Sequence, residues 1–290
     1  MLNNSLLKKT VTVFASHQLS CVLFFFLFLL TVLGTIDEKY IGLYETQKKY
    51  FESLFLIYKV GPVSIPLPGV YLVLILLFIN TIVGTIKRIK FKPAKYGVII
   101  IHFSMVLLFA GSFITFKFSD DGQMTLQEGQ SSSRFVSYHE WEVAIIDVNN
   151  SSEDIEYVFD LNFDHQLKNL IFTDANLPFE LEVLDYQRHA IVQPKGPMFT
   201  TEATIVNGFF INPLDLEKEN EKNTPAILLK ISDKTQKSDV AKNYIVSGAT
   251  SVQNSLQLQS ADKKYIVCLR KKSWEVPFKI TLDRVERDLY

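Results

Sequence analysis

Two polar side chains interrupt the most apolar stretches of the chain: Asn80 lies within residues 70–86 and His102 within residues 96–116. A polar group inside a membrane is costly unless a hydrogen bond or a ligand compensates it. Counted from the cationic segment between the two stretches, each side chain lies six residues inside, which is about 9 Å of helix. Two partners are therefore open to His102: Asn80 on the neighbouring helix, through a hydrogen bond, or a porphyrin iron, for which neutral imidazole is a common axial ligand.

These stretches belong to a set of three apolar runs that are long enough to cross a membrane as helices. The runs cover residues 19–36, 70–86 and 96–116, have 18, 17 and 21 residues, and contain no Asp, Glu, Lys or Arg. A helix needs about 20 residues to span the hydrocarbon core of a bilayer. The first run has a long core and no A-x-A-like cleavage site after it, so we expect a retained helix rather than a signal peptide.

The distribution of charge predicts how the helices are oriented. Residues 87–95 carry five Lys/Arg and no acid, whereas residues 37–69 balance four Lys against four Asp/Glu. Short loops rich in Lys and Arg stay on the cytoplasmic side. The sequence therefore predicts a cytoplasmic N-terminus over residues 1–18, a membrane region over 19–116 with 37–69 as its outer interfacial loop, and an extracytoplasmic domain over 117–290.

The outer loop has an amphipathic pattern of its own. Its apolar residues recur at helical spacing on one side, with Lys and Glu elsewhere around the turn; they are Tyr50, Phe51, Leu54, Phe55 and Tyr58. This pattern predicts a helix that lies on the outer leaflet. A Pro and Gly cluster in residues 62–69 ends the helix before the second run begins.

The last part of the chain has the composition of an acidic, strand-rich domain. Residues 117–290 hold 27 Asp/Glu against 19 Lys/Arg, a net charge of −8, whereas residues 1–116 carry a net +7. Because the positive part is mostly membrane segment and the soluble part is acidic, we expect no binding to nucleic acid. Short alternating stretches, separated by turns such as Asp121-Gly122 and Asn207-Gly208, predict an all-β sandwich or open barrel.

The outer domain carries no recognisable catalytic motif, because G-x-S-x-G, H-E-x-x-H, P-loop and paired-cysteine patterns are all absent from its sequence. Its histidines, His139, His165 and His189, match no metal-binding spacing, and we interpret them as surface or hydrogen-bonded residues. His139 is the nearest of them to the membrane exit and the best placed to approach a cofactor. The two cysteines, Cys21 and Cys268, fall in a membrane run and in the outer domain, so we expect no disulfide between them.

Three segments together resemble the ResB (CcsB) family of cytochrome c biogenesis proteins of the type II system: LGTIDEKYIGLYETQKKYFESLF, PLPGVYLVLILLFINTIVGTIKR and HFSMVLLFAGSFITFKFSDDGQMTLQEGQ. The resemblance is specific over about residues 30–145 and looser beyond them. It implies a non-catalytic subunit of a holocytochrome c synthase-type complex in the bacterial inner (cytoplasmic) membrane. Such a complex carries haem b outward through the lipid bilayer and attaches it to CxxCH apocytochromes c. The implied partners are a CcsA-type membrane subunit, apocytochrome c and haem.

The resemblance also implies a role for His102. The family's third-helix histidine, an axial ligand of haem iron inside the membrane, falls on His102, with Asn80 as its neighbour. The attachment site and the second axial ligand are expected on the partner, because His17 precedes the first helix and the other three histidines lie outside the membrane. The family implies a fourth membrane helix after the outer domain, and the residues up to Tyr290 contain no such run, as in a fragment or a shortened form. The competing hypothesis is a membrane-anchored binding or scaffold protein that holds no haem.

Overall fold

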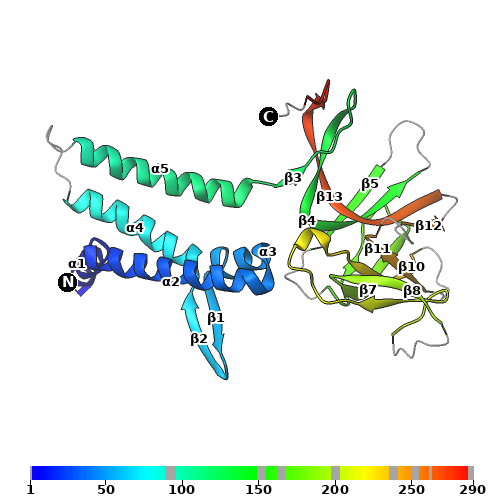
Figure 1. Ribbon diagram of the computed structural model, residues 1–290, viewed down its shortest axis with the longest axis horizontal. Coiled ribbons are helices and arrows are strands. Elements are labelled where there is room, and N and C mark those ends of the chain that lie inside the picture. Colours follow the sequence, from blue (N-terminus) through cyan, green and yellow to red (C-terminus); the bar gives the residue numbers. More distant parts are fainter. Residues whose placement is uncertain are drawn as a thin grey trace. The chain divides into compact units, whose positions relative to one another are not determined.

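The structure is a computed structural model, in which the chain folds as two compact units, Met1–Ser119 and Asp120–Tyr290 (Figure 1). The residues that it describes are 2–88, 96–148, 155–161, 167–196, 203–234, 241–249, 255–260 and 263–286.

The first unit is built on helices. Its elements are α1 (Leu2–Phe14), α2 (His17–Ile41), α3 (Leu43–Thr46), the π-helical turn η1 (Gln47–Phe51), β1 (Phe55–Val60), β2 (Val63–Pro68), α4 (Val70–Arg88) and α5 (Tyr96–Phe118). Of these, α2, α4 and α5 are long and apolar enough to cross a membrane. This confirms the predicted architecture of three membrane helices followed by an all-β region.

The ends of α2 are set by caps rather than by the limits of its apolar run. The Ser16 hydroxyl accepts a hydrogen bond from the backbone N–H of Leu19 at 3.0 Å, which satisfies a donor that the first helical turn leaves free. At the other end Gly42 has a φ of 83°, a left-handed conformation that favours glycine, and its N–H donates to the carbonyl of Glu38. The helix therefore begins two residues before the apolar run and ends five residues after it.

The prediction of an outer helix over Tyr50, Phe51, Leu54, Phe55 and Tyr58 is wrong in its second half. Helical structure ends at Phe51, and the chain continues as the antiparallel hairpin of β1 and β2. The two-residue turn of this hairpin contains Gly61 at a φ of 58°, which matches the positive φ that tight hairpin turns require. Pro62 is the second residue of this turn, and Pro66 and Pro68 are tolerated in β2 because a two-stranded hairpin consists of edge strands only.

The π-helical turn is attached to α2 through Tyr50, whose side chain is fully buried. The Tyr50 hydroxyl donates a hydrogen bond to Asp37 at 2.7 Å, and the Lys49 ammonium pairs with the same carboxylate. Around Tyr50 the apolar contacts between α2 and α4 form one cluster, which includes Leu30 and Val73. The loop between these helices is thus a folded part of the first unit.

The second unit consists of antiparallel strands. They are β3 (Gly122–Gln123), β4 (Ser131–Asp147), β5 (Ile155–Leu161), β6 (Ile171–Phe172), β7 (Phe179–Gln187), β8 (Ala190–Pro194), β9 (Phe209–Pro213), β10 (Ala226–Asp233), β11 (Lys242–Ser247), β12 (Ser255–Ser260) and β13 (Lys263–Thr281), with a short 3-10 helix η3 (Asn220–Lys222) before β10. One sheet has the order β11-β10-β7-β6, a second has the order β12-β13-β4-β3 with β5 also paired to β4, and β8 pairs with β9.

The two larger sheets pack as a sandwich. Buried residues from both sheets form one core cluster, which includes Val143 of β4, Val267 of β13, Leu181 of β7 and Leu229 of β10. Alternate residues of β7 and β10, such as Leu181 and Val183 or Ile227 and Leu229, belong to this core, as the two-residue period of a strand requires. Of the two predicted architectures, sandwich and open barrel, the structure has the sandwich.

Candidate functional site

His102 lies on α5 with one ring nitrogen occupied. Its Nδ1 is 2.9 Å from the carbonyl oxygen of Val98, one turn earlier on the helix. A carbonyl oxygen only accepts hydrogen bonds, so Nδ1 is the donor in this contact and Nε2 is the ring nitrogen that remains for another partner. Among the residues that the structure describes, none bonds to this Nε2. Histidines that bind metals have this arrangement, in which the second nitrogen donates to a carbonyl and fixes the tautomer.

Asn80 of α4 makes its hydrogen bonds elsewhere. Its side-chain oxygen accepts from the hydroxyl of Ser20 at 2.6 Å, and its amide nitrogen donates to the carbonyls of Phe14 at 2.6 Å and Ser16 at 3.2 Å. The residue is only 7% exposed. The hydrogen bond between Asn80 and His102, one of the two alternatives in the sequence, is therefore not formed.

The two residues nevertheless line the same pocket. This pocket has a volume of about 420 Å³ and lies between α2, α4 and α5. Apolar side chains such as Leu77 and Phe109 make up much of its wall, and His17 lines it together with Asn80 and His102. Pockets for small molecules and cofactors have volumes of about 300–1,000 Å³ and a mostly apolar lining with few polar groups. The site falls in this class.

His17 was missed by the sequence reasoning, which placed it before the first membrane helix without a role. The structure makes it the first residue of α2. The signal in the sequence was Ser16, a residue type that commonly caps a helix N-terminus, immediately before the apolar run. Recognising this cap would have placed His17 in the first turn of the membrane helix.

The outer histidines are held by the polypeptide around η3. His139 lies with Nδ1 3.2 Å from the side-chain nitrogen of Asn220 and with Nε2 3.7 Å from a carboxylate oxygen of Glu221. His189 accepts a hydrogen bond at Nδ1 from the backbone N–H of Thr224 at 3.1 Å. His165 lies outside the described residues.

A larger cavity of about 630 Å³ lies at the end of β7, lined by Lys168, Asp185 and His189 among others. The carboxylate of Asp185 is engaged by its neighbours at the end of β7, where it accepts from the backbone N–H of Tyr186 and from the side chain of Gln187. Within the described part of the chain, no group of three or more His, Cys, Asp or Glu side chains is placed to hold a metal ion.

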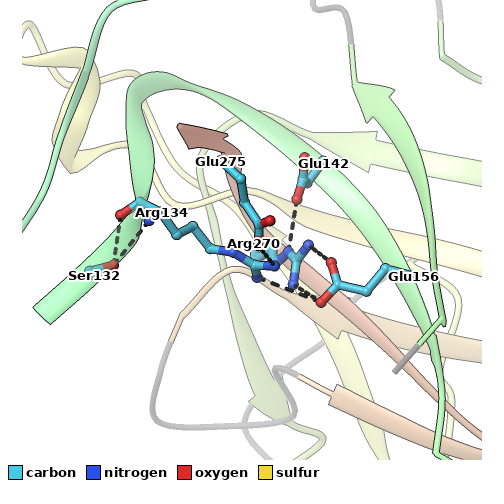
Figure 2. A network of polar contacts seen from close by, with 6 residues as sticks. All are labelled: Ser132, Arg134, Glu142, Glu156, Arg270 and Glu275. Carbon is cyan, nitrogen blue, oxygen red and sulfur yellow. Dashed lines mark hydrogen bonds and ion pairs between the residues drawn. The ribbon is translucent and has the colours of Figure 1, made fainter. Parts of the chain in front are cut away.

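A network of charged side chains in the second unit is centred on Arg270 of β13 (Figure 2). Its Nε donates to Glu142 of β4 at 2.8 Å, and its terminal nitrogens donate to Glu156 of β5. Arg134 extends the cluster by donating to Glu275 at 3.0 Å. The hydrogen bond from Arg270 lowers the pKa of Glu156 below its ordinary value.

This cluster crosses three neighbouring strands, and its charges are paired with one another. Glu142 is 2% exposed, so its carboxylate depends on Arg270 for compensation. The arrangement connects β4, β5 and β13 by ion pairs across the sheet, and we interpret its role as structural.

Beside this cluster, burial lowers the pKa of Lys271 to about 8. Its ammonium donates to the carbonyl of Tyr138 at 2.7 Å and lies 4.5 Å from the centre of the Trp141 ring. A cation over an aromatic face is stabilised by the ring's quadrupole. The Lys271 side chain thus contacts two residues of β4, Tyr138 and Trp141, next to the point where the register between β4 and β13 shifts.

The chain matches no known family model, and no curated protein matches it either.

Proposed function

We propose that the chain is a haem-handling membrane subunit of a complex that assembles c-type cytochromes, of the ResB (CcsB) kind. The observation that carries the proposal is the contact between Nδ1 of His102 and the carbonyl oxygen of Val98, which leaves Nε2 for a metal. The donor set supports iron in a porphyrin over a bare metal ion. A macrocycle supplies four nitrogens of its own, so that axial imidazoles are sufficient.

In this proposal haem b is cargo, and the protein's part is to bind and orient it. His102 supplies one axial imidazole from α5, and apolar side chains such as Leu77 and Phe109 exclude water from the porphyrin ring. The chain performs no chemistry alone. A CcsA-type subunit and apocytochrome c are the partners, and covalent attachment takes place on the partner side.

The proposed location is the bacterial inner membrane, with the N-terminus in the cytoplasm and the outer domain on the far side. Support comes from the five Lys/Arg in residues 87–95, which are expected to stay in the cytoplasm. A reporter enzyme that is active only outside the cytoplasm, fused after Tyr290, is expected to give a signal. A signal from a cytoplasm-specific reporter at the same position would contradict the proposed orientation and indicate the opposite one.

The proposal is tested with the full chain purified in detergent together with its membrane partners. Wild-type protein is expected to show a haem Soret band, and His102→Ala is expected to lose it while still inserting in the membrane. Ser104→Ala is the matched control, because Ser104 lies on the same helix and also bonds to a carbonyl four residues earlier, Ile100.

Added imidazole is expected to restore haem to His102→Ala by occupying the vacated position. Full haem content and full cytochrome c maturation in His102→Ala would instead favour the competing hypothesis, a membrane-anchored scaffold protein without haem.

A further inference from the structure

The β1–β2 hairpin leaves the helices of the first unit sideways. In Figure 1 it projects away from α2 and α4 rather than continuing along them. It forms a two-stranded sheet of its own, so each strand has one edge that no other strand covers. β2 ends at Pro68, and α4 begins two residues later at Val70. The hairpin is therefore attached directly to the end of a helix that is long and apolar enough to cross a membrane.

The base of the hairpin is part of the apolar packing between these helices. Leu56 of β1 is 7% exposed and belongs to the buried cluster that contains Leu30 of α2 and Val73 of α4. Leu30 lies in the apolar run 19–36, and Val73 is near the start of α4. The hairpin thus emerges where the apolar segments of the helices end. In a bundle that spans a membrane, this level is the boundary between acyl chains and headgroups.

Beyond this base, the hairpin exposes apolar side chains on both of its faces. Ile57 lies on one face, whereas Val60 and Val63, which pair with each other, lie on the opposite face. Their exposed fractions are 63%, 53% and 56%. Lys59 is the only charged residue in the sequence from 54 to 68. Neighbouring exposed apolar side chains of this kind indicate a contact with lipid or with another protein.

The free edge of β2 carries few hydrogen-bond donors. Because proline has no N–H, Ile57↔Pro66 and Phe55↔Pro68 are pairs of the ladder without mutual hydrogen bonds. In such pairs the backbone groups point away from the neighbouring strand, so residues 64, 66 and 68 face the free edge of β2. Of these three, only Ser64 has an N–H. The prolines thus remove two donors that would be costly wherever water is scarce.

We propose that the β1–β2 hairpin is a lipid-binding element. It lies in the headgroup region of the leaflet next to the start of α4, the outer leaflet in the proposed orientation, with its apolar side chains on the upper acyl chains. Continuity with α4 and with the cluster between the helices identifies lipid as the occupant. The free edge of β1 keeps the N–H groups of Phe55, Ile57 and Lys59, which need water, so the hydrocarbon core is not its location. The headgroup region offers both water and apolar contact.

The test uses the full chain in lipid nanodiscs of phosphatidylcholine and phosphatidylglycerol, with a nitroxide spin label on a single cysteine in a Cys21→Ser, Cys268→Ser background. Electron paramagnetic resonance measures how often the label collides with oxygen, which concentrates in lipid, and with a water-soluble nickel chelate. The oxygen-to-nickel ratio at Val63→Cys is expected to be severalfold above that at Val148→Cys, an exposed valine of the second unit. It is expected to be below that at Phe28→Cys, an exposed position in the middle of α2.

Quenching by labelled lipids measures the depth independently. A fluorophore on Val63→Cys is expected to be quenched more strongly by lipids with a nitroxide on the headgroup than by lipids with a nitroxide near the end of an acyl chain. The same order is expected for Ile57→Cys on the opposite face, and the reverse order for Phe28→Cys. Circular dichroism of each labelled protein checks that the fold is retained.

Three outcomes overturn the inference. Equal collision ratios at Val63→Cys and Val148→Cys would place the hairpin in water. A ratio at Val63→Cys equal to that at Phe28→Cys would place it in the hydrocarbon core, and protection from both reagents would show that another protein molecule covers it. The proposed function is judged separately, because these measurements involve no haem and that proposal fails only when His102→Ala leaves the haem content of the complex unchanged.

Discussion

Replacing Arg270 by methionine is expected to lower the free energy of unfolding of the outer domain by about 3 kcal/mol. The change leaves Glu142, which is 2% exposed, without the guanidinium that lies 2.8 Å from its carboxylate. Removing one partner of a buried ion pair costs about 3–5 kcal/mol. We take the lower end because the Arg270 side chain is itself 25% exposed and because methionine preserves most of its packing volume. For a domain of this size the expected fall in Tm is roughly 6–12 °C.

The two tryptophans of the chain make this change measurable in the full-length protein. Trp141 and Trp274 both lie in the outer domain, so that tryptophan fluorescence during urea unfolding in detergent reports on this domain alone. Arg284→Met is the matched control, because Arg284 pairs with Glu286 among the described residues and both side chains are largely exposed. Exposed pairs of this kind contribute little.

A double variant separates the loss of charge compensation from the loss of packing. Glu142→Gln combined with Arg270→Met removes both charges, and it is expected to recover much of the stability that Arg270→Met loses. Equal unfolding free energies for Arg270→Met and Arg284→Met would refute the assignment of Arg270 as the compensating charge for Glu142.

Three further predictions concern the same domain. Gly248→Ala places a Cβ 2.4 Å from Cζ3 of Trp141, so we expect a loss of about 1–3 kcal/mol and a shifted Trp emission; an unchanged spectrum and midpoint would contradict the packing. Because Arg270 lowers the pKa of Glu156 from its ordinary value of 4.5, its contribution is present above that pH and is lost as the pH falls through the lowered pKa. Glu156→Gln should therefore flatten the acid side of the stability profile, as urea titrations between pH 3 and 6 can test. Burial raises the pKa of the Cys268 thiol, and in a Cys21→Ser background we expect alkylation to be slow in the folded protein and fast in urea; equal rates would show an open thiol.

The membrane helices were predictable because apolar length is a direct consequence of bilayer thickness. The limits of the helices were not, because they depend on capping. The first apolar run begins at residue 19, yet α2 begins at His17 because Ser16 caps it. The absence of a disulfide was also predictable, since Cys21 and Cys268 lie in separate units, and both are free in the structure.

The outer loop shows why a short amphipathic pattern is ambiguous. Tyr50 and Phe51 belong to a helical turn, while Phe55 and Tyr58 belong to a strand, although all four fit one helical face. A handful of apolar positions over nine residues is too few to separate a helical period from local alternation. The stronger local signal was Gly61-Pro62, because a hairpin turn with positive φ fixes the pairing of the strands on both sides.

The pocket shows a different limit of the sequence. Their depth in the apolar runs identified Asn80 and His102 as residues that need partners. Depth does not tell a structural side chain from a ligand-binding one, because the cost of burying a polar group is the same for both. The hydrogen bonds separate the two roles. Both ends of the Asn80 amide form hydrogen bonds, to the Ser20 hydroxyl of α2 and to the Phe14 carbonyl at the end of α1. In His102 only Nδ1 is bonded, to the carbonyl of Val98 on the same helix. Because Asn80 is satisfied by backbone carbonyls, whose positions no residue type encodes, its role became visible only with the fold. His17, which follows Ser16, lines the same pocket, so residues from three separate segments of the sequence meet at one site.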